Sequence, residues 1–233
     1  MKKVAITGAT GAIGRALRAG LEGVYELQPM SRSLDGTDLR DAAGLEARFA
    51  GCDAVVHLAW AYARDGQNTG SKSMANVLMH QNVLLAAKAA KVPRLVMASS
   101  VHADFFYDWM GPGLLGVDRQ QRANGIYGGL KLLCEALGRE HADEATRIVD
   151  VRYGGVTGDG SPHRTDNWEQ RVWLSHPDLC AMARAVVDHP APPVYSLFYA
   201  VSANDHRVHD TTNPFGWEPK DAADADIRAE LSP

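Results

Sequence analysis

Hydrophobic residues along the chain recur at two spacings, one typical of buried strands and the other of amphipathic helices. The apolar run at 3–7 predicts a strand, and the apolar positions from Ile13 to Leu21 follow helical spacing. The same alternation continues to the end of the chain. It predicts further strands at 24–30, 54–58, 95–97, 148–151 and 194–201 and further helices around 45–49, 74–85, 127–137 and 179–187. Strands that alternate with helices predict an α/β fold with a doubly wound parallel sheet.

Three glycines stand between the first strand and the first helix. Gly8, Gly11 and Gly14 occupy GxxGxxG spacing within Thr7-Gly8-Ala9-Thr10-Gly11-Ala12-Ile13-Gly14. Such a turn brings the backbone close to a pyrophosphate and presents the unpaired N–H groups of a helix N-terminus to it. The strand before the turn and the helix after it therefore favour dinucleotide binding over a purely structural turn.

No repeat or linker divides the chain, so we expect a single domain over 1–233. Within it, 1–152 is expected to form the cofactor-binding core. After Arg152, glycine, proline, tryptophan and histidine become frequent. We expect 153–233 to be a small substrate-binding excursion that closes over the carboxyl ends of the strands, where open α/β sheets bind their ligands.

Tyr127 and Lys131 are four residues apart in a predicted helix and therefore share one face of it. A tyrosine is a poor base at its ordinary pKa near 10 unless a cation stands beside it, and Lys131 is the cation expected to lower that pKa. The preceding strand ends at Ser99-Ser100, where a serine hydroxyl is placed to hold a substrate oxygen. We predict Tyr127 as the acid/base, Lys131 as its partner and Ser100 as the hydroxyl.

Composition and residue spacing argue against several other classes of protein. The formal charge of -4 and pI near 6.1 leave no basic excess for nucleic acid. No targeting segment or membrane span is evident, so a cytoplasmic protein is expected. Cys52, Cys134 and Cys180 are widely spaced, and His206 and His209 have no acidic or thiol partner at the spacing of metal ligands, so no metal site is predicted.

With these motifs, the chain resembles the extended short-chain dehydrogenase/reductase superfamily, which includes the NAD-dependent epimerases and dehydratases. The resemblance covers residues 1–217. Further motifs that carry it are Asp38–Asp41, Asp53–Ala59, Asn76, Asn82–Leu84 and Arg152–Val156, the last placed by the family pattern after the sixth strand. Within the superfamily, the segments most similar to the uronate dehydrogenases are Ala98–His102, Trp173–Asp178, Ser202–Asp205 and Gly216–Lys220. That group oxidises hexuronic acids at the anomeric carbon with NAD.

The resemblance implies two sets of contacts. The cofactor-binding set is Gly8, Thr10, Gly11, Ala12, Ile13, Gly14, Ser31, Arg32, Asp38, Leu39, Leu58, Ala59, Trp60, Asn76, Ala98, Tyr127, Lys131 and Tyr153. Lys131 would also hydrogen-bond the nicotinamide ribose. The substrate set is Tyr62, Ser100, Val101, His102, Gly155 and Trp168.

The chain departs from the uronate dehydrogenase pattern at both ends of the site. Arg32, next to Ser31, stands where that group has an acidic residue for the ribose hydroxyls; an arginine there accepts a ribose phosphate, so NADP is expected to be preferred, with NAD as the alternative. Tyr62, Val101, Gly155 and Trp168 replace serine, asparagine, serine and the arginine that clamps the substrate carboxylate. Arg164 and Arg171 are nearby candidates for a displaced cation. In many extended members the working hydroxyl lies at the position of Val101.

We therefore predict an NAD(P)-dependent oxidoreductase that acts on a small sugar-like or cyclic substrate. The alternatives are a nucleotide-sugar epimerase or dehydratase and a non-catalytic regulator that senses the cofactor. The short segment after residue 153 argues against the first alternative, and the intact Tyr127 and Lys131 argue against the second. The apolar faces at 74–85 and 130–137 either join two copies in a homodimer, as in many relatives, or pack within the monomer.

Overall fold

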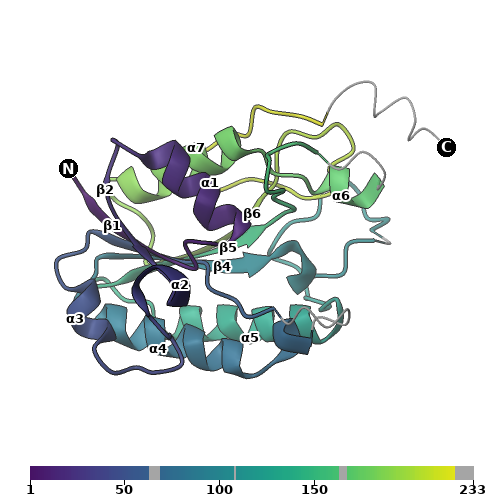
Figure 1. Ribbon diagram of the computed structural model, residues 1–233. Coiled ribbons are helices and arrows are strands. Elements are labelled where there is room, and N and C mark those ends of the chain that lie inside the picture. Colours follow the sequence, from purple (N-terminus) through teal and green to yellow (C-terminus); the bar gives the residue numbers. More distant parts are fainter. Residues whose placement is uncertain (63–68, 108, 163–166, 224–233) are drawn as a thin grey trace.

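The computed structural model describes residues 1–62, 69–107, 109–162 and 167–223, which form a six-stranded sheet with helices on both faces (Figure 1). The strand order is β2-β1-β3-β4-β5-β6, and each neighbouring pair is parallel. The strands are β1 Lys3–Thr7, β2 Glu26–Met30, β3 Ala54–His57, β4 Arg94–Ser100, β5 Arg147–Tyr153 and β6 Tyr195–Ala200. The predicted α/β fold with a doubly wound parallel sheet, of the Rossmann type, is confirmed.

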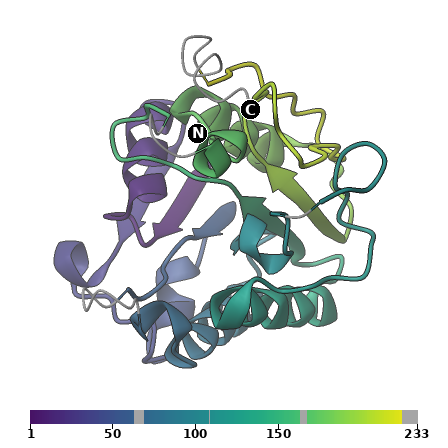
Figure 2. The same ribbon diagram turned by 90° about the vertical axis from the view of Figure 1, so that its right-hand side faces the viewer.

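Parallel neighbours require crossover connections, and each of the five connections between consecutive described strands contains at least one α-helix. Helices α1 and α7 pack together on one face of the sheet, while α3, α4 and α5 cover the other (Figures 1 and 2). The helices are α1 Ala12–Leu21, α2 Arg32–Asp35, α3 Leu45–Phe49, α4 Ala75–Ala89, α5 Gly125–His141, α6 Asn167–Arg171 and α7 His176–Asp188, with 3₁₀ turns η1 Thr69–Lys72 and η2 Val101–Ala103.

The two helix layers explain why the strands are apolar on both faces. Successive residues of a strand point to opposite sides of the sheet. In β1, Val4 and Ile6 pack into the core beneath α1 and α7, whereas Ala5 packs into the core beneath α3 and α4. A strand covered on both sides therefore becomes a continuous hydrophobic run, as the sequence pattern indicated.

The structure changes some predicted boundaries. The second strand begins at Glu26, and the long helix marked by the apolar positions 74–85 runs from Ala75 to Ala89, before Pro93. Arg152 and Tyr153 are the last residues of β5, the fifth of the six described strands, so their predicted place after a sixth strand is wrong. Residues 36–44, between α2 and α3, form loops and turns, so the next strand after β2 is β3. After β5, the chain adds β6 to the sheet and packs α7 against α1.

An ion pair almost closed to water joins α5 to the sheet. Arg152 in β5 donates to both carboxylate oxygens of Glu135 in α5, over 2.8 and 2.7 Å. The hydroxyl of Ser99, in β4, also donates to this carboxylate, and Arg152 donates to the hydroxyl of Tyr199, in β6, over 2.8 Å. One helix is thus fixed to three adjacent strands by charged and polar groups that satisfy each other.

The described residues offer no route across a membrane, because none of their helices is both long and apolar enough to span one. Cys52 and Cys134 are buried, Cys180 is half-buried, and all three are free thiols. Among the described residues, no group of three or more histidine, cysteine, aspartate and glutamate side chains is placed to hold a metal ion.

We expect Glu135→Ala to lower the free energy of unfolding by about 3–5 kcal/mol, because it leaves the buried guanidinium of Arg152 without its counter-charge. Denaturant unfolding measures this. Glu140→Ala, an exposed site on the same helix, is the control and should change stability by no more than about 0.5 kcal/mol. Equal stability of the two variants would contradict the role assigned to the ion pair.

Candidate active site

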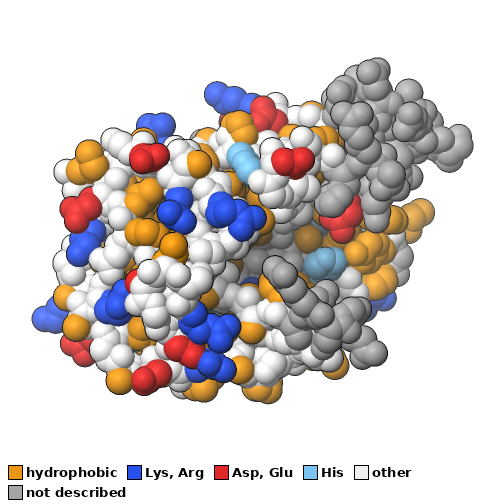
Figure 3. All heavy atoms as spheres, in the orientation of Figure 1, with side chains coloured by type: hydrophobic (Ala, Val, Ile, Leu, Met, Phe, Trp, Pro, Cys, Tyr) orange, Lys and Arg blue, Asp and Glu red, His pale blue; other side chains and the backbone are white. Residues whose placement is uncertain are grey.

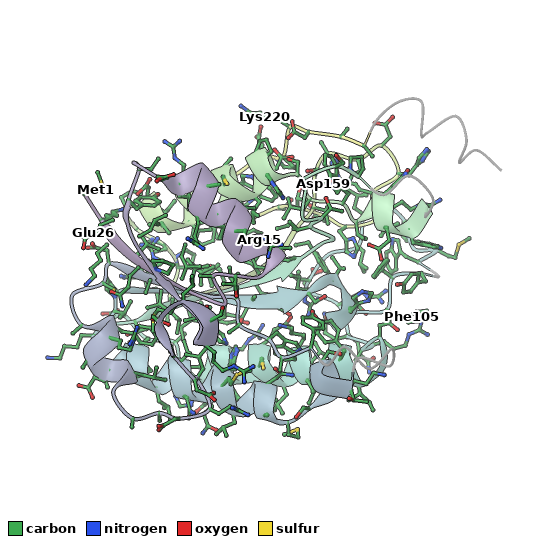
Figure 4. All side chains as sticks on the ribbon, in the orientation of Figure 1. Met1, Arg15, Glu26, Phe105, Asp159 and Lys220 are labelled. Atoms are coloured by element: carbon green, nitrogen blue, oxygen red, sulfur yellow. The ribbon has the colours of Figure 1, made fainter. Side chains whose placement is uncertain are left out.

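A cavity of about 880 Å³ opens at the carboxyl ends of the strands, where the order reverses between β1 and β3. Figure 3 shows the surface hollowed near the middle of the view, with Lys and Arg side chains to the left of the hollow. In Figure 4, Met1 and Glu26 lie at the amino ends of the strands, Phe105 lies towards the opposite end of the molecule, and Asp159 lies a little right of the centre of the view. Open α/β folds bind ligands in such a crevice.

Most of the predicted residues line this cavity. From the cofactor set these are Gly8, Thr10, Gly11, Ala12, Ile13, Gly14, Ser31, Arg32, Asp38, Leu39, Leu58, Ala59, Trp60, Ala98, Tyr127, Lys131 and Tyr153, and from the substrate set Tyr62 and Ser100. Residues distant in sequence are brought together because β1, β3, β4 and β5 are adjacent and end at the same edge.

The glycine turn fits the backbone of a dinucleotide. Gly8 has φ +69°, and a Cβ there would lie 2.6 Å from the nitrogen of Ala59. A Cβ on Gly14 would lie 2.5 Å from the oxygen of Gly8, so α1 packs close to the turn because this residue has no side chain. Gly11 is the N-cap of α1 and offers no side-chain acceptor, which leaves the first N–H groups of the helix directed at the cavity.

A second feature suits a bound polar molecule. The hydroxyl of Tyr153 is buried at the cavity wall and has no hydrogen-bond partner among the described residues. Buried hydroxyls are normally paired, so this one is available to a ligand. Burial raises the pKa of Tyr153, which keeps the phenol protonated and able to donate.

The far end of the cavity carries positive charge. Ser31 caps α2 by accepting from the N–H of Leu34, and the exposed Arg32 follows it at the cavity edge. Asp38 also lines this end, and its hydrogen bonds with Arg40 hold its pKa well below the usual range, with the charge of Arg32 adding to the effect. Arg40 is thus paired with a carboxylate, whereas Arg32 faces the cavity beside two serines, Ser31 and Ser33.

Tyr127, Lys131 and Ser100 meet at the other end. Tyr127 and Lys131 lie in the first two turns of α5, and Ser100 ends β4. The Ser100 hydroxyl accepts from the N–H of His102 over 3.2 Å and lies close enough to Tyr127 to act on the pKa of its phenol. The ammonium of Lys131 donates to the carbonyl of Ala98 over 2.6 Å, and burial lowers the pKa of Lys131 to about 8.

The expected lowering of the Tyr127 pKa by Lys131 is not found in this structure. Burial raises the Tyr127 pKa, the phenol of Tyr62 raises it further, and the hydroxyl of Ser100 acts in the opposite direction. The reason is geometric: the Lys131 nitrogen is held on Ala98 and lies 5.7 Å from the centre of the Tyr127 ring. At neutral pH the phenol of Tyr127 is therefore protonated.

Ser99 and Ser100 point to different places although they are neighbours. Successive strand residues face opposite sides. The side chain of Ser99 bonds Glu135, while that of Ser100 turns towards Tyr127. Of the two hydroxyls, that of Ser100 is available next to the phenol.

Five predicted residues do not line the cavity. Asn76 is buried, accepts from the N–H of Ala61 over 2.6 Å and donates to the carbonyl of Gly70 over 2.8 Å, so it holds the two ends of the segment after β3. The other four are Val101, His102, Gly155 and Trp168.

These four residues lie beyond the end of the cavity that contains Tyr127. Val101 is buried in an apolar cluster that Trp168 contacts, and Gly155 forms a bridge with Trp173. His102 lies between Tyr127 and Phe106, with ring centres 6.0 and 5.7 Å away. This wall of the site is therefore built largely of rings.

The structure describes only one of the two arginines expected as a displaced clamp for a substrate carboxylate. Arg171 lies 4.6 Å above the ring of Trp168, and Arg164 lies outside the described residues. Sequence reasoning also missed some cavity residues, namely Met30, Ser33, Thr37, Ala61, Met79, Ser99, Gly154 and Val156. Several of these are sequence neighbours of predicted residues, so extending each predicted motif by one residue would have found them. Nothing in the sequence pointed to Met79, in α4.

Comparisons with known proteins agree with this geometry. A model of the NAD dependent epimerase/dehydratase family matches residues 4–176. The chain belongs to this family. Among its curated relatives, the uronate dehydrogenase of Agrobacterium fabrum is 31% identical to it, over 97% of this chain and 87% of that protein. The L-arabinose 1-dehydrogenase (NAD(P)(+)) of Haloferax volcanii is also 31% identical, over 95% of this chain and 97% of that protein.

Solved structures lead to the same family. The crystal structure of uronate dehydrogenase from Agrobacterium tumefaciens matches with a TM-score of 0.79 at 28% identity, covering 100% of this chain and 90% of that chain. A mutant of that enzyme complexed with NAD gives a TM-score of 0.78. The resemblance inferred from the motifs is confirmed, and so is the prediction of an NAD(P)-dependent enzyme in this epimerase/dehydratase family.

Proposed function

We propose that this family member is an NADP-preferring oxidoreductase that acts on a hydroxyl or carbonyl carbon of a small, sugar-like or cyclic substrate. One observation carries the proposal: a cavity suited to a dinucleotide ends at Tyr127, Lys131 and Ser100. The dehydrogenases among the relatives support the reaction class. Retention of NADP or NAD after incubation, together with its catalytic consumption, tests the proposal.

The bound cofactor would supply or accept the hydride; its pyrophosphate would be held by the Gly8–Gly14 turn and its ribose by Lys131. The chain's own residues handle the proton. In reduction, the Tyr127 phenol donates its proton to the substrate oxygen; in oxidation, its phenolate takes the hydroxyl proton. Ser100 holds the same oxygen by a hydrogen bond. Since the Tyr127 pKa is raised, the free protein presents this residue as the acid.

We expect Tyr127→Phe to lower kcat by about 10²–10⁴-fold, because it removes the proton donor while keeping the ring. Cofactor affinity, measured by calorimetry, should stay close to that of the parent. Tyr25→Phe is the control and should retain activity, because Tyr25 is remote from the cavity and its hydroxyl donates to Asp188. Turnover of the Tyr127 variant within about threefold of the parent would remove this residue from the mechanism.

The cofactor preference rests on Arg32. A guanidinium at the ribose end of the cavity can bind a phosphate through two hydrogen bonds, whereas a carboxylate repels a phosphate and accepts from ribose hydroxyls. We expect Arg32→Asp to shift the binding preference from NADP towards NAD. Calorimetric titration of both cofactors into the parent, this variant and the remote, exposed Arg184→Asp measures the shift. Tighter binding of NAD than NADP by the parent would overturn the assignment.

We propose that the substrate lacks the carboxylate of a hexuronic acid. The resemblance places Trp168 where the uronate dehydrogenase group has its clamping arginine. Tyr62 adds ring surface to the cavity. The relative named for L-arabinose, a neutral sugar, supports the same direction. A carboxylate without its cation loses a hydrogen bond worth about 1.5–3 kcal/mol, or one to two orders of magnitude.

We therefore expect glucuronate and galacturonate to be poor substrates, and neutral cyclic sugars such as L-arabinose to be better. Steady-state assays with each compound and both cofactors measure this. A kcat/KM above about 10⁴ M⁻¹s⁻¹ for either uronate would place the chain among uronate dehydrogenases and point to Arg171 or Arg164 as the displaced clamp.

We also propose a homodimer formed through α4 and α5. These helices pack side by side, and their outer faces expose Leu78, Leu85, Ile126 and Leu133, with the exposed Met74 just before α4. Neighbouring apolar residues on adjacent helices suit a four-helix contact between two copies. Their inner faces, including Val77 and Leu130, pack within the monomer.

A further inference from the structure

Lys131 is buried yet carries an ammonium group with three N–H donors. The carbonyl of Ala98 accepts one of these N–H groups. On another side the indole ring of Trp60 lies with its centre 3.6 Å from the Lys131 nitrogen. A buried charge is costly unless it has partners, and the electron-rich face of an indole is the best aromatic partner for a cation.

The ring of Trp60 is fixed at several points. Its indole N–H donates to the carbonyl of Ser71, in η1, over 3.0 Å. Its apolar surface packs against a cluster formed by Val77, Leu130 and Cys134. Its edge meets the ring of Tyr127, with centres 5.7 Å apart and an interplanar angle of 88°. The indole therefore contacts both residues of the YxxxK pair in a defined orientation.

We propose that Trp60 is a positioning residue whose indole face keeps the Lys131 ammonium charged and in place beside Tyr127. This role goes beyond lining the cofactor cavity and rests on the proposed function, because it acts on catalysis through Lys131. Cation–π attraction strengthens when water is excluded, as it is around this buried nitrogen. An aliphatic side chain at residue 60 would fill the space without supplying that attraction.

Several other groups act on Lys131, and each stays in place when Trp60 is changed. Burial lowers the pKa of Lys131 to about 8, and nearby acidic groups oppose this effect. The groups facing it are Tyr127, Cys134 and Glu135 from α5, His57 from β3, His80 from α4 and Asp150 from β5. Burial holds the pKa of both histidines far below neutral, so they carry no charge at pH 7. A matched change at Trp60 therefore isolates the ring.

The test uses the full chain labelled with ¹³C-lysine and without added cofactor. NMR follows the ε-methylene signals through a pH titration, and Lys131→Arg identifies the Lys131 signal by its loss. We expect this signal to titrate near pH 8 and its ε-protons to be shifted upfield of those of Lys2 and Lys88, because they lie over an aromatic face. Absence of the upfield shift in the parent would overturn the proposal without any variant.

Two variants of Trp60 then distinguish the effect of its aromatic ring on the Lys131 pKa from the effect of side-chain volume. Trp60→Leu keeps an apolar side chain but no ring face, so the Lys131 pKa should fall by about one unit or more. Trp60→Phe keeps a ring face and should retain most of the parent value. An unchanged or raised pKa in Trp60→Leu would show that burial alone governs Lys131 and would overturn the proposal.

Kinetics link the same change to catalysis. With an assay in hand, the pH profile of kcat/KM should shift in Trp60→Leu in parallel with the NMR titration and remain close to the parent in Trp60→Phe. A parallel shift in both variants, or none in Trp60→Leu despite a changed Lys131 pKa, would contradict a catalytic effect. Failure to find any turnover would count against the proposed function, while the NMR titration would still decide the contact.

Discussion

The contact between Glu135 and Arg152 is the constraint on which the site depends. Two opposite charges in a nearly dry interior are stable only when each satisfies the other, so helix α5 can dock on the sheet in one register. Ser99 and Tyr199 complete the arrangement from strands on either side. Because Glu135 lies one helical turn after Lys131 and two after Tyr127, fixing the carboxylate also fixes the helix face that presents Tyr127 and Lys131 to the cavity.

Different residues of α5 therefore have different roles: Glu135 holds the helix on the sheet, and Lys131 faces the cavity. At Glu135, on the buried face of the helix, charge is neutralised by direct pairing with Arg152. Towards the cavity, Lys131 has a carbonyl and an indole instead of a carboxylate, which leaves its charge available to a bound molecule. The end of β4 shows the same contrast, since the Ser99 hydroxyl bonds Glu135 of the ion pair whereas the Ser100 hydroxyl lies near Tyr127. Stability and chemistry thus use neighbouring residues that face opposite ways.

The dinucleotide-like region of the cavity adjoins a separate wall of aromatic rings beyond its Tyr127 end. The glycine turn and the start of α1 require only backbone and the absence of side chains, so they serve any dinucleotide. Beyond Tyr127, in contrast, His102, Phe106 and Trp168 build a wall from ring surface. Relatives that share the first region therefore need not share a substrate.

The sequence by itself determined the alternation of strands and helices, the glycine turn and the YxxxK pair, because each depends on local spacing along the backbone. It gave no sign that Tyr127 has a raised pKa, that Asn76 bonds backbone groups or that Trp60 lies on Lys131. These features depend on how separate elements pack, since burial and side-chain direction arise only when α5, β3 and β4 meet. Tertiary structure therefore decided the electrostatics of residues that the sequence had already identified.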